Sequence, residues 1–139
     1  PTIGTRSPTN QVNVQITYLS RAGSPGDSNI PSSLNSTQLM AQIGYTLEPL
    51  GKGTASFSGY TYSILPADTV SVNVYLQRWD GSSWVDISSA YDIRHDADYA
   101  SALKGYGGSG YLRLRTVHFV QDGEPSETKT ATSDFIYVE

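Results

Sequence analysis

Alternation of apolar and polar residues recurs along this chain and is clearest at residues 70–77. Every second residue there is aliphatic, and the aliphatic residues are Val70, Val72, Val74 and Leu76. Because successive side chains of a β-strand point to opposite faces, this period of two predicts a strand with one buried face. Weaker alternation of the same kind occurs in segments 39–47, 55–62, 112–119 and 130–138.

Turn-forming residues separate these segments. The pair Asp80-Gly81 lies between Trp79 and Trp84 and tolerates the positive φ angles that a tight hairpin needs. Turn signals recur about every 8–12 residues with no alternating helical segments, which is typical of a sandwich or barrel. The predicted fold class is therefore all-β: an immunoglobulin/fibronectin-like antiparallel β-sandwich of about seven strands with an extra N-terminal arm strand.

Two segments fit the alternation less well. Gly59 interrupts the pattern of residues 55–62, and an isolated glycine in a strand indicates a β-bulge. Residues 96–104 fit either a short helix that begins at Asp96 and ends before Gly105, or a strand with Tyr99 and Leu103 on one face. We favour the strand for residues 96–104.

The N-terminal part of the chain predicts a separate arm. Val12, Val14, Ile16 and Tyr18 alternate with polar residues, so the arm is an amphipathic strand. Residues 20–36 then carry prolines, glycines and serines without any period, and such long irregular segments are usually linkers or functional segments. We therefore divide the chain into an arm with its linker, residues 1–36, and a sandwich domain, residues 37–139.

The apolar face of the arm must be buried somewhere. A strand of eight residues, 12–19, is about 27 Å long, which matches the edge of a sandwich. The linker can stretch to roughly 55 Å, so the arm can return to its own domain or pair with a neighbouring molecule. Strand donation to a neighbour repeats head to tail and yields a polymer of the chain with itself.

Composition excludes several classes of protein. Cysteine is absent, which rules out disulfides and thiolate zinc sites. The net charge is −4 and no basic cluster occurs, so we predict no nucleic-acid partner. No apolar run is long enough to predict a membrane span. The printed chain begins with Pro1, which we interpret as the result of processing and, with the composition, as a sign of a secreted, extracellular protein.

The titratable residues do not form a recognisable catalytic motif. His118 lies within a predicted strand, so we interpret it as a packed or edge histidine. His95 lies close to Asp92, Asp96 and Asp98, whose oxygens have the chemistry of calcium ligands, but the spacing lacks the fixed glycine of a calcium loop. We interpret this segment as a solvated loop, and we predict no metal, no cofactor and no enzymatic activity.

The aromatic residues suggest a second kind of binding. The chain has ten tyrosines and two tryptophans. Trp79 and Trp84 flank the predicted hairpin, where they can pair across the strands. Exposed aromatic rings also stack on sugars, and on this reading Trp79, Trp84, Tyr91 and Tyr106 are the candidate residues for binding a cell-wall or other glycan.

Three segments in the second half of the chain support a family resemblance. They are YLQRWDGSSWVDIS at 75–88, GYLRLRTVHFV at 110–120 and SETKTATSDFIYV at 126–138. Residues 37–139 resemble an uncharacterised family of small secreted immunoglobulin-like proteins of Gram-positive bacteria. The resemblance implies export and an immunoglobulin-like sandwich, and it implies no activity.

Together these observations predict a non-enzymatic extracellular structural or interaction protein. Its expected mode of action is self-assembly by complementation with the N-terminal strand, for example as the subunit of a surface filament. The alternative is a secreted glycan-binding module.

Overall fold

The computed structural model describes residues 10–17 and 38–139 of the chain. Tyr18 and the predicted linker, residues 20–36, lie outside the described residues. Seven strands form one antiparallel sheet, and the described part contains no helix, which confirms the predicted all-β class. The strands are β1 (Val12–Thr17), β2 (Met40–Gly51), β3 (Thr54–Trp79), β4 (Trp84–Gly107), β5 (Gly110–Gln121), β6 (Ser126–Thr132) and β7 (Ile136–Val138).

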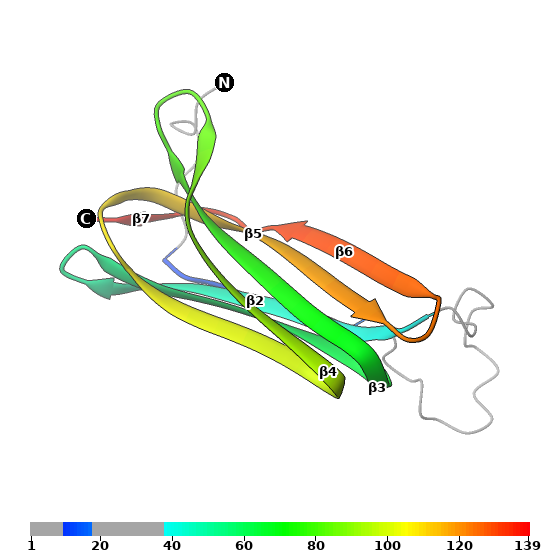
Figure 1. Ribbon diagram of the computed structural model, residues 1–139. Helices are drawn as coiled ribbons and strands as arrows, with labels where there is room; N and C mark the ends of the chain where they lie inside the picture. The colour runs from blue at the N-terminus through cyan, green and yellow to red at the C-terminus, as the bar shows by residue number, and fades with distance from the viewer. Residues whose placement is uncertain (1–9, 18–37) are drawn as a thin grey trace.

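The long hairpin of β3 and β4 folds back across itself and creates two layers (Figure 1). Its register shifts between Tyr62 and Ala67, where the chain carries Pro66 and bends. After the bend, the second half of β3 faces the first half, and the Thr61 hydroxyl donates a hydrogen bond of 2.9 Å to the Ser71 carbonyl. One hydrogen-bonded ribbon therefore contributes to both layers of the domain.

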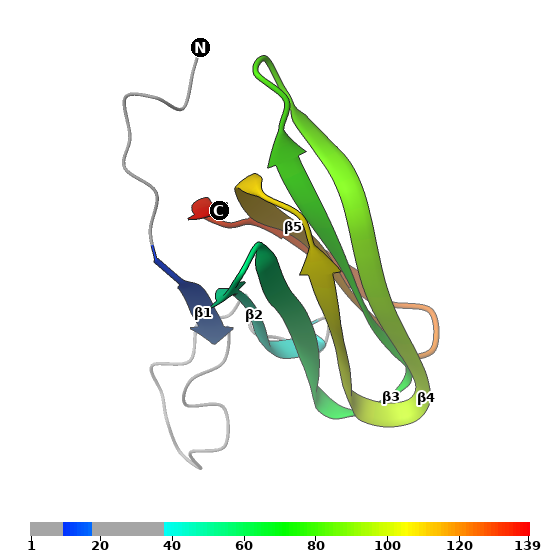
Figure 2. The ribbon, with the colours of Figure 1, turned by 90° about the vertical axis from the view of Figure 1, so that its left-hand side faces the viewer.

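The two layers share β3 and β4 and differ in their other strands. The first half of β3 pairs with β2, which in turn pairs with β1. The second half of β3 pairs with β5, which continues into β6 and β7. Figure 2 shows the two layers facing one another. The architecture is sandwich-like, as predicted, but both layers belong to one curled sheet, whereas an immunoglobulin domain has two separate sheets.

The core fills the space between the two layers. The aliphatic residues of the predicted 70–77 strand are fully buried, and they face Phe57, Ile43 and Leu47 of the first layer. Pairing continues through Gly59 without a shift, to Tyr45 on one side and Ala102 on the other. The predicted bulge at Gly59 is therefore wrong: the glycine is needed because the opposite layer approaches closely at this point.

Several predicted strand boundaries also change. The segments predicted at 55–62 and 70–77 are halves of a single strand, β3, so the sheet has seven strands with the arm included. Residues 96–104 belong to β4, which confirms the strand, although Asp96 has a φ of 54°. The predicted last strand is interrupted: at the break, Leu114 N donates to Ser133 Oγ and Ser133 N donates to the Leu114 carbonyl, each at 2.8 Å.

The turn between β3 and β4 has the predicted hairpin chemistry. Trp79 pairs with Trp84, and Gly81 has a φ of 104°. One carboxylate oxygen of Asp80 accepts hydrogen bonds of 2.8 Å from the backbone amides of Ser82 and Ser83. These two hydrogen bonds lower the pKa of Asp80, because they favour the charged carboxylate.

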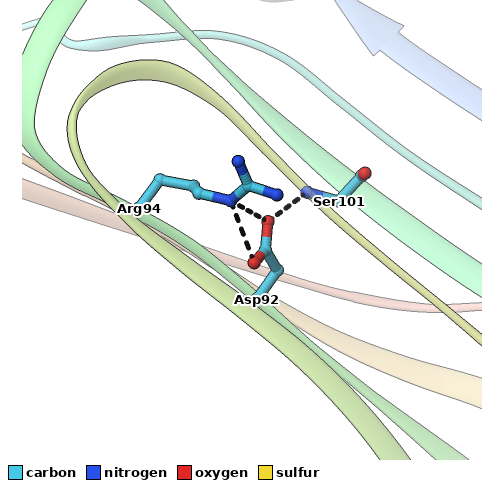
Figure 3. Close-up of polar contacts among 3 residues, drawn as sticks. All are labelled: Asp92, Arg94 and Ser101. Atoms are coloured by element: carbon cyan, nitrogen blue, oxygen red, sulfur yellow. Dashed lines mark hydrogen bonds and ion pairs between the residues drawn. The ribbon is translucent and has the colours of Figure 1, made fainter.

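The free edge of β4 is closed by side chains that link its two halves. Asp92 accepts a hydrogen bond of 3.0 Å from the Ser101 amide and forms an ion pair of 3.0 Å with Arg94 (Figure 3). The Lys104 ammonium donates to the Ser89 carbonyl at 3.2 Å. Charged residues along an exposed strand oppose pairing with another chain. The β4 edge is therefore protected.

Candidate functional site

The arm strand β1 pairs with its own domain. It is antiparallel to β2, with a register that runs from Val12 opposite Leu47 to Thr17 opposite Gln42. Val12 is only 5% exposed, and Val14 and Ile16 are half-buried against the core. The amphipathic strand predicted for these three residues is confirmed over Val12–Thr17. Of the two fates considered for the arm, the structure contains pairing within one molecule.

The opposite face of the arm is polar and exposed. Gln42 Nε2 donates a hydrogen bond of 3.0 Å to Thr17 Oγ1, and the Thr46 hydroxyl donates to Asn13 Oδ1 at 3.2 Å. These two side-chain pairs report the same register as the backbone. Asn13 and Thr46 are therefore neighbours on the surface, close enough for a chemical cross-link between β1 and β2.

The β1 strand also differs from other edges of the sheet in its charge. Its sequence VNVQIT has no charged residue and no proline. By contrast, the edge strand β6 carries Glu127 and Lys129, and β4 carries the Asp92–Arg94 ion pair described above. Edges without charge, proline or bulges are the ones that accept a further strand. Of the edge strands β1, β4 and β6 in the described residues, β1 is thus the least protected.

The tryptophans at the hairpin form the centre of an aromatic cluster. The ring centroids of Trp79 and Trp84 are 5.5 Å apart with a tilt of 60°. Trp84 also lies 6.1 Å from Phe135, whose ring is 5.8 Å from Tyr111. The predicted cross-strand pair is therefore present, and it continues onto the outer face of β5.

Two arginines extend this cluster along β5. The Arg113 guanidinium lies 4.6 Å from the centroid of the Trp84 ring, and the Arg115 guanidinium lies 4.2 Å from that of Tyr75. We call Tyr75, Trp79, Trp84, Arg113 and Arg115 the arginine–aromatic face. Alternation with the buried Leu112 and Leu114 places both arginines on the outer face. The two arginines were not among the predicted site residues, although this alternation was the signal for them.

Polar side chains hold the two arginines in place. Arg113 Nε donates to Gln77 Oε1 at 2.8 Å, and Gln77 Nε2 donates to Asp86 Oδ1 at 2.8 Å. Arg115 donates to the second oxygen of Asp86 at 3.2 Å. Partial burial lowers the pKa of Arg113, but an arginine remains charged at any physiological pH. The face therefore presents two ordered cations beside aromatic rings.

The other two predicted glycan-binding residues occupy different places. Tyr91 is 69% exposed and pairs with Asn73 on the outer side of the second layer, the same side as Trp84. Tyr106 packs against the core, and Arg78 Nη1 donates to its hydroxyl at 3.3 Å. Tyr106 therefore does not join the outer face, because the alternation of β4 directs it inward.

His118 is completely buried between the layers. The Thr61 hydroxyl already donates to Ser71, so it accepts from His118 Nδ1 at 2.9 Å, and the Thr116 hydroxyl donates to Nε2 at 2.8 Å. Burial lowers the pKa of His118 to about 4, while a hydrogen bond with the backbone of Tyr60 acts in the opposite direction. Of the two predicted positions, packed or edge, the packed histidine is confirmed, and its ring has no access to a substrate.

The aspartates near His95 do not surround a common point. His95 Nδ1 is 3.3 Å from the Thr69 hydroxyl, and Asp92 is engaged with Arg94 and Ser101. The segment is largely exposed to solvent, as predicted, but it is part of β4 and not a loop. Among residues 10–17 and 38–139, no three acidic, histidine or cysteine side chains cluster as metal ligands would. The same residues include no helix with the length and hydrophobicity of a membrane span.

Comparisons with known proteins found no matching family model, no curated relative and no similar solved structure. The resemblance to secreted proteins of Gram-positive bacteria therefore stays a prediction.

Proposed function

We propose that the protein is a non-enzymatic, extracellular structural subunit that self-assembles by exchanging its N-terminal strand. The observation that carries the proposal is β1: its apolar side chains complete the core next to β2, yet it is connected to β2 only through the 22 residues 18–39. A chain of that length can reach about 75 Å when extended. The site on β2 that β1 occupies within its own molecule can therefore also accept β1 of a neighbouring molecule.

Exchange of β1 conserves the local interactions. A neighbour's β1 in the same register buries Val12, Val14 and Ile16 against the same core and makes the same backbone hydrogen bonds. The balance between the two states then depends on the entropy of the connection and on protein concentration. If each molecule donates forward and accepts from behind, the contact does not close, and a filament results.

A disulfide between β1 and β2 distinguishes pairing within one molecule from exchange of β1 between molecules. The chain has no cysteine, so the double variant Asn13→Cys with Thr46→Cys introduces its only two thiols, and the β1–β2 register places them opposite each other. After concentration and oxidation, we expect a ladder of disulfide-linked oligomers in non-reducing electrophoresis, because β1 is supplied by a neighbour. An oxidised band that stays entirely monomeric at all concentrations contradicts self-assembly.

A matched pair of charge variants tests whether the buried face of β1 drives assembly. Val12→Asp places a carboxylate in the core, whereas Gln15→Asp places the same charge on the exposed face. We expect light scattering and electron microscopy to show loss of oligomers for Val12→Asp and little change for Gln15→Asp. Deletion of residues 1–35 should abolish oligomers as well, and a synthetic peptide of residues 10–18 should bind the deletion variant.

The second candidate function is glycan binding, and the aromatic cluster of the second layer favours it. Tyr91 is exposed and Trp84 is half-buried on one side of the sheet, and flat aromatic surfaces suit the apolar faces of sugar rings. The test is retention on immobilised polysaccharides of the wild type and of Trp84→Ala. Tyr62→Ala is the control, since Tyr62 is an exposed aromatic residue of the other layer. Absence of retention on every polysaccharide contradicts this function.

A further inference from the structure

We infer that the arginine–aromatic face is a binding site for an acidic polysaccharide whose sugars carry carboxylates. This inference rests on the second candidate function and names the class of glycan. Two observations support it: both guanidiniums are stacked on aromatic rings, and they lie on the same side of one strand, β5.

The geometry of the arginines suits carboxylate recognition. Arg113 and Arg115 are two residues apart on the same side of β5, a repeat of about 6.6–6.8 Å along the strand. Stacking on Trp84 and Tyr75 fixes the planes of the guanidiniums, which lowers the entropy that a ligand must offset. Within the described residues, the two terminal nitrogens of Arg113 have no hydrogen-bond partner, so a carboxylate can accept from both.

The local charge is opposite to that of the whole chain. On the outer positions of 75–79, 84–91 and 111–115, the charged residues are Asp86, Arg113 and Arg115, so the face has a net charge of +1. The complete chain has a net charge of −4. Asp86 forms its ion pair with Arg115 and is linked to Arg113 only through Gln77. An anionic ligand is therefore attracted to this face in preference to the rest of the molecule.

The aromatic rings distinguish a sugar chain from other polyanions. Tyr91 is 69% exposed on the same side as the arginines and offers a stacking surface for a pyranose ring beside the half-buried Trp79 and Trp84, and Arg113 covers part of the Trp84 ring. Tight nucleic-acid binding uses many phosphate contacts, and two arginines release few counterions. A single-stranded nucleic acid is therefore the less suitable occupant, and it serves as a comparison ligand in the test.

The test uses two polysaccharide probes that have the same sugar chain and differ in charge. Polygalacturonate carries a carboxylate on each sugar, and its fully methyl-esterified form lacks the charge. With the full chain, we expect calorimetry or affinity electrophoresis to show at least tenfold tighter binding of the acid than of the ester. Arg113→Gln and Arg115→Gln should each weaken binding of the acid about tenfold, and Arg113→Lys should not restore it, because lysine lacks the planar fork.

A matched arginine variant controls for general electrostatics. Arg94→Gln removes the same charge from β4, outside the arginine–aromatic face, and should leave binding unchanged. Thermal unfolding of all variants verifies that they fold. Equal binding of acid and ester overturns the inference while leaving glycan binding in place. Equal weakening by Arg94→Gln, or comparable affinity for single-stranded DNA, also overturns it. Failure to bind any polysaccharide removes both the inference and the glycan-binding function.

Discussion

Gly59 lies directly against Val74 of the opposite layer. A Cβ atom at Gly59 would come within 2.6 Å of Val74 Cγ2, closer than any real Cβ contact. The two residues belong to the same strand, β3, which meets itself because the hairpin folds back at residues 63–66. The closeness of the two layers thus depends on the absence of one methyl group.

Gly59→Ala should destabilise the fold by about 1–3 kcal/mol, because the added methyl group forces the layers apart or Val74 into another rotamer. Chemical denaturation measures the change. Gly107→Ala is the control: it lies on the partner strand, and a Cβ there meets no atom within 4 Å. Gly107→Ala should change the free energy of unfolding by less than about 0.5 kcal/mol. Equal effects of the two substitutions would show that Gly59 makes no special close contact.

The buried His118 should make stability depend on pH below neutrality. Its pKa is about 4 in the folded protein, compared with 6.5 for an unperturbed histidine. Above pH 6.5 the ring is neutral in both states; between pH 6.5 and 4 the unfolded chain binds a proton that the folded chain does not. Acidification through this range should therefore cost about 3 kcal/mol of stability from this residue alone.

Urea denaturation at several pH values checks the effect of His118. His118→Gln should be less stable at pH 7 and should show a shallower loss of stability between pH 6.5 and 4. The carboxylates are common to both proteins, so the difference between the two curves isolates the histidine. Parallel curves would show that His118 takes up a proton in the folded state as easily as in the unfolded state.

Asp92→Ala should open the free edge of β4. The substitution removes the acceptor of the Ser101 amide and the Arg94 ion pair, at a cost of about 1–2 kcal/mol for a partly exposed charged hydrogen bond. Hydrogen exchange by NMR should show faster exchange of the Ser101 amide. Asp98→Ala removes an exposed carboxylate of the same strand and should leave that amide unchanged. If the Ser101 amide exchanges as slowly in both variants as in the wild type, Asp92 does not close the edge.

Glu127 should stabilise the start of β2. One of its carboxylate oxygens accepts hydrogen bonds from the backbone amides of Leu39 and Met40, at 3.1 and 2.7 Å. Glu127→Ala should cost about 1–2 kcal/mol and increase exchange of these two amides, because they lose a charged acceptor. Glu127→Gln retains an acceptor oxygen and should lie between the two proteins. An unchanged exchange rate in Glu127→Ala contradicts the role.

Some parts of the candidate sites could be predicted from the sequence, and others could not. The alternation around Val12 identified the buried face of the arm, and the Asp-Gly turn identified the Trp79–Trp84 pair, because both depend on neighbours in sequence. The stacking of Arg113 on Trp84 was not predicted, since β4 and β5 meet on one face only through their common partner β3. Tyr106 was misassigned because exposure depends on which side of β4 faces the second layer.

The sequence alone determined that this chain forms amphipathic strands, where its tightest hairpin lies, and which residues of each strand are apolar. These properties follow from side-chain period and turn chemistry, which act over a few residues. Only the tertiary structure decided that β3 crosses from one layer to the other and that Gly59 meets Val74. The bend at residues 63–66 has no periodic signal, and the contacts that it creates join residues that alternation alone cannot relate.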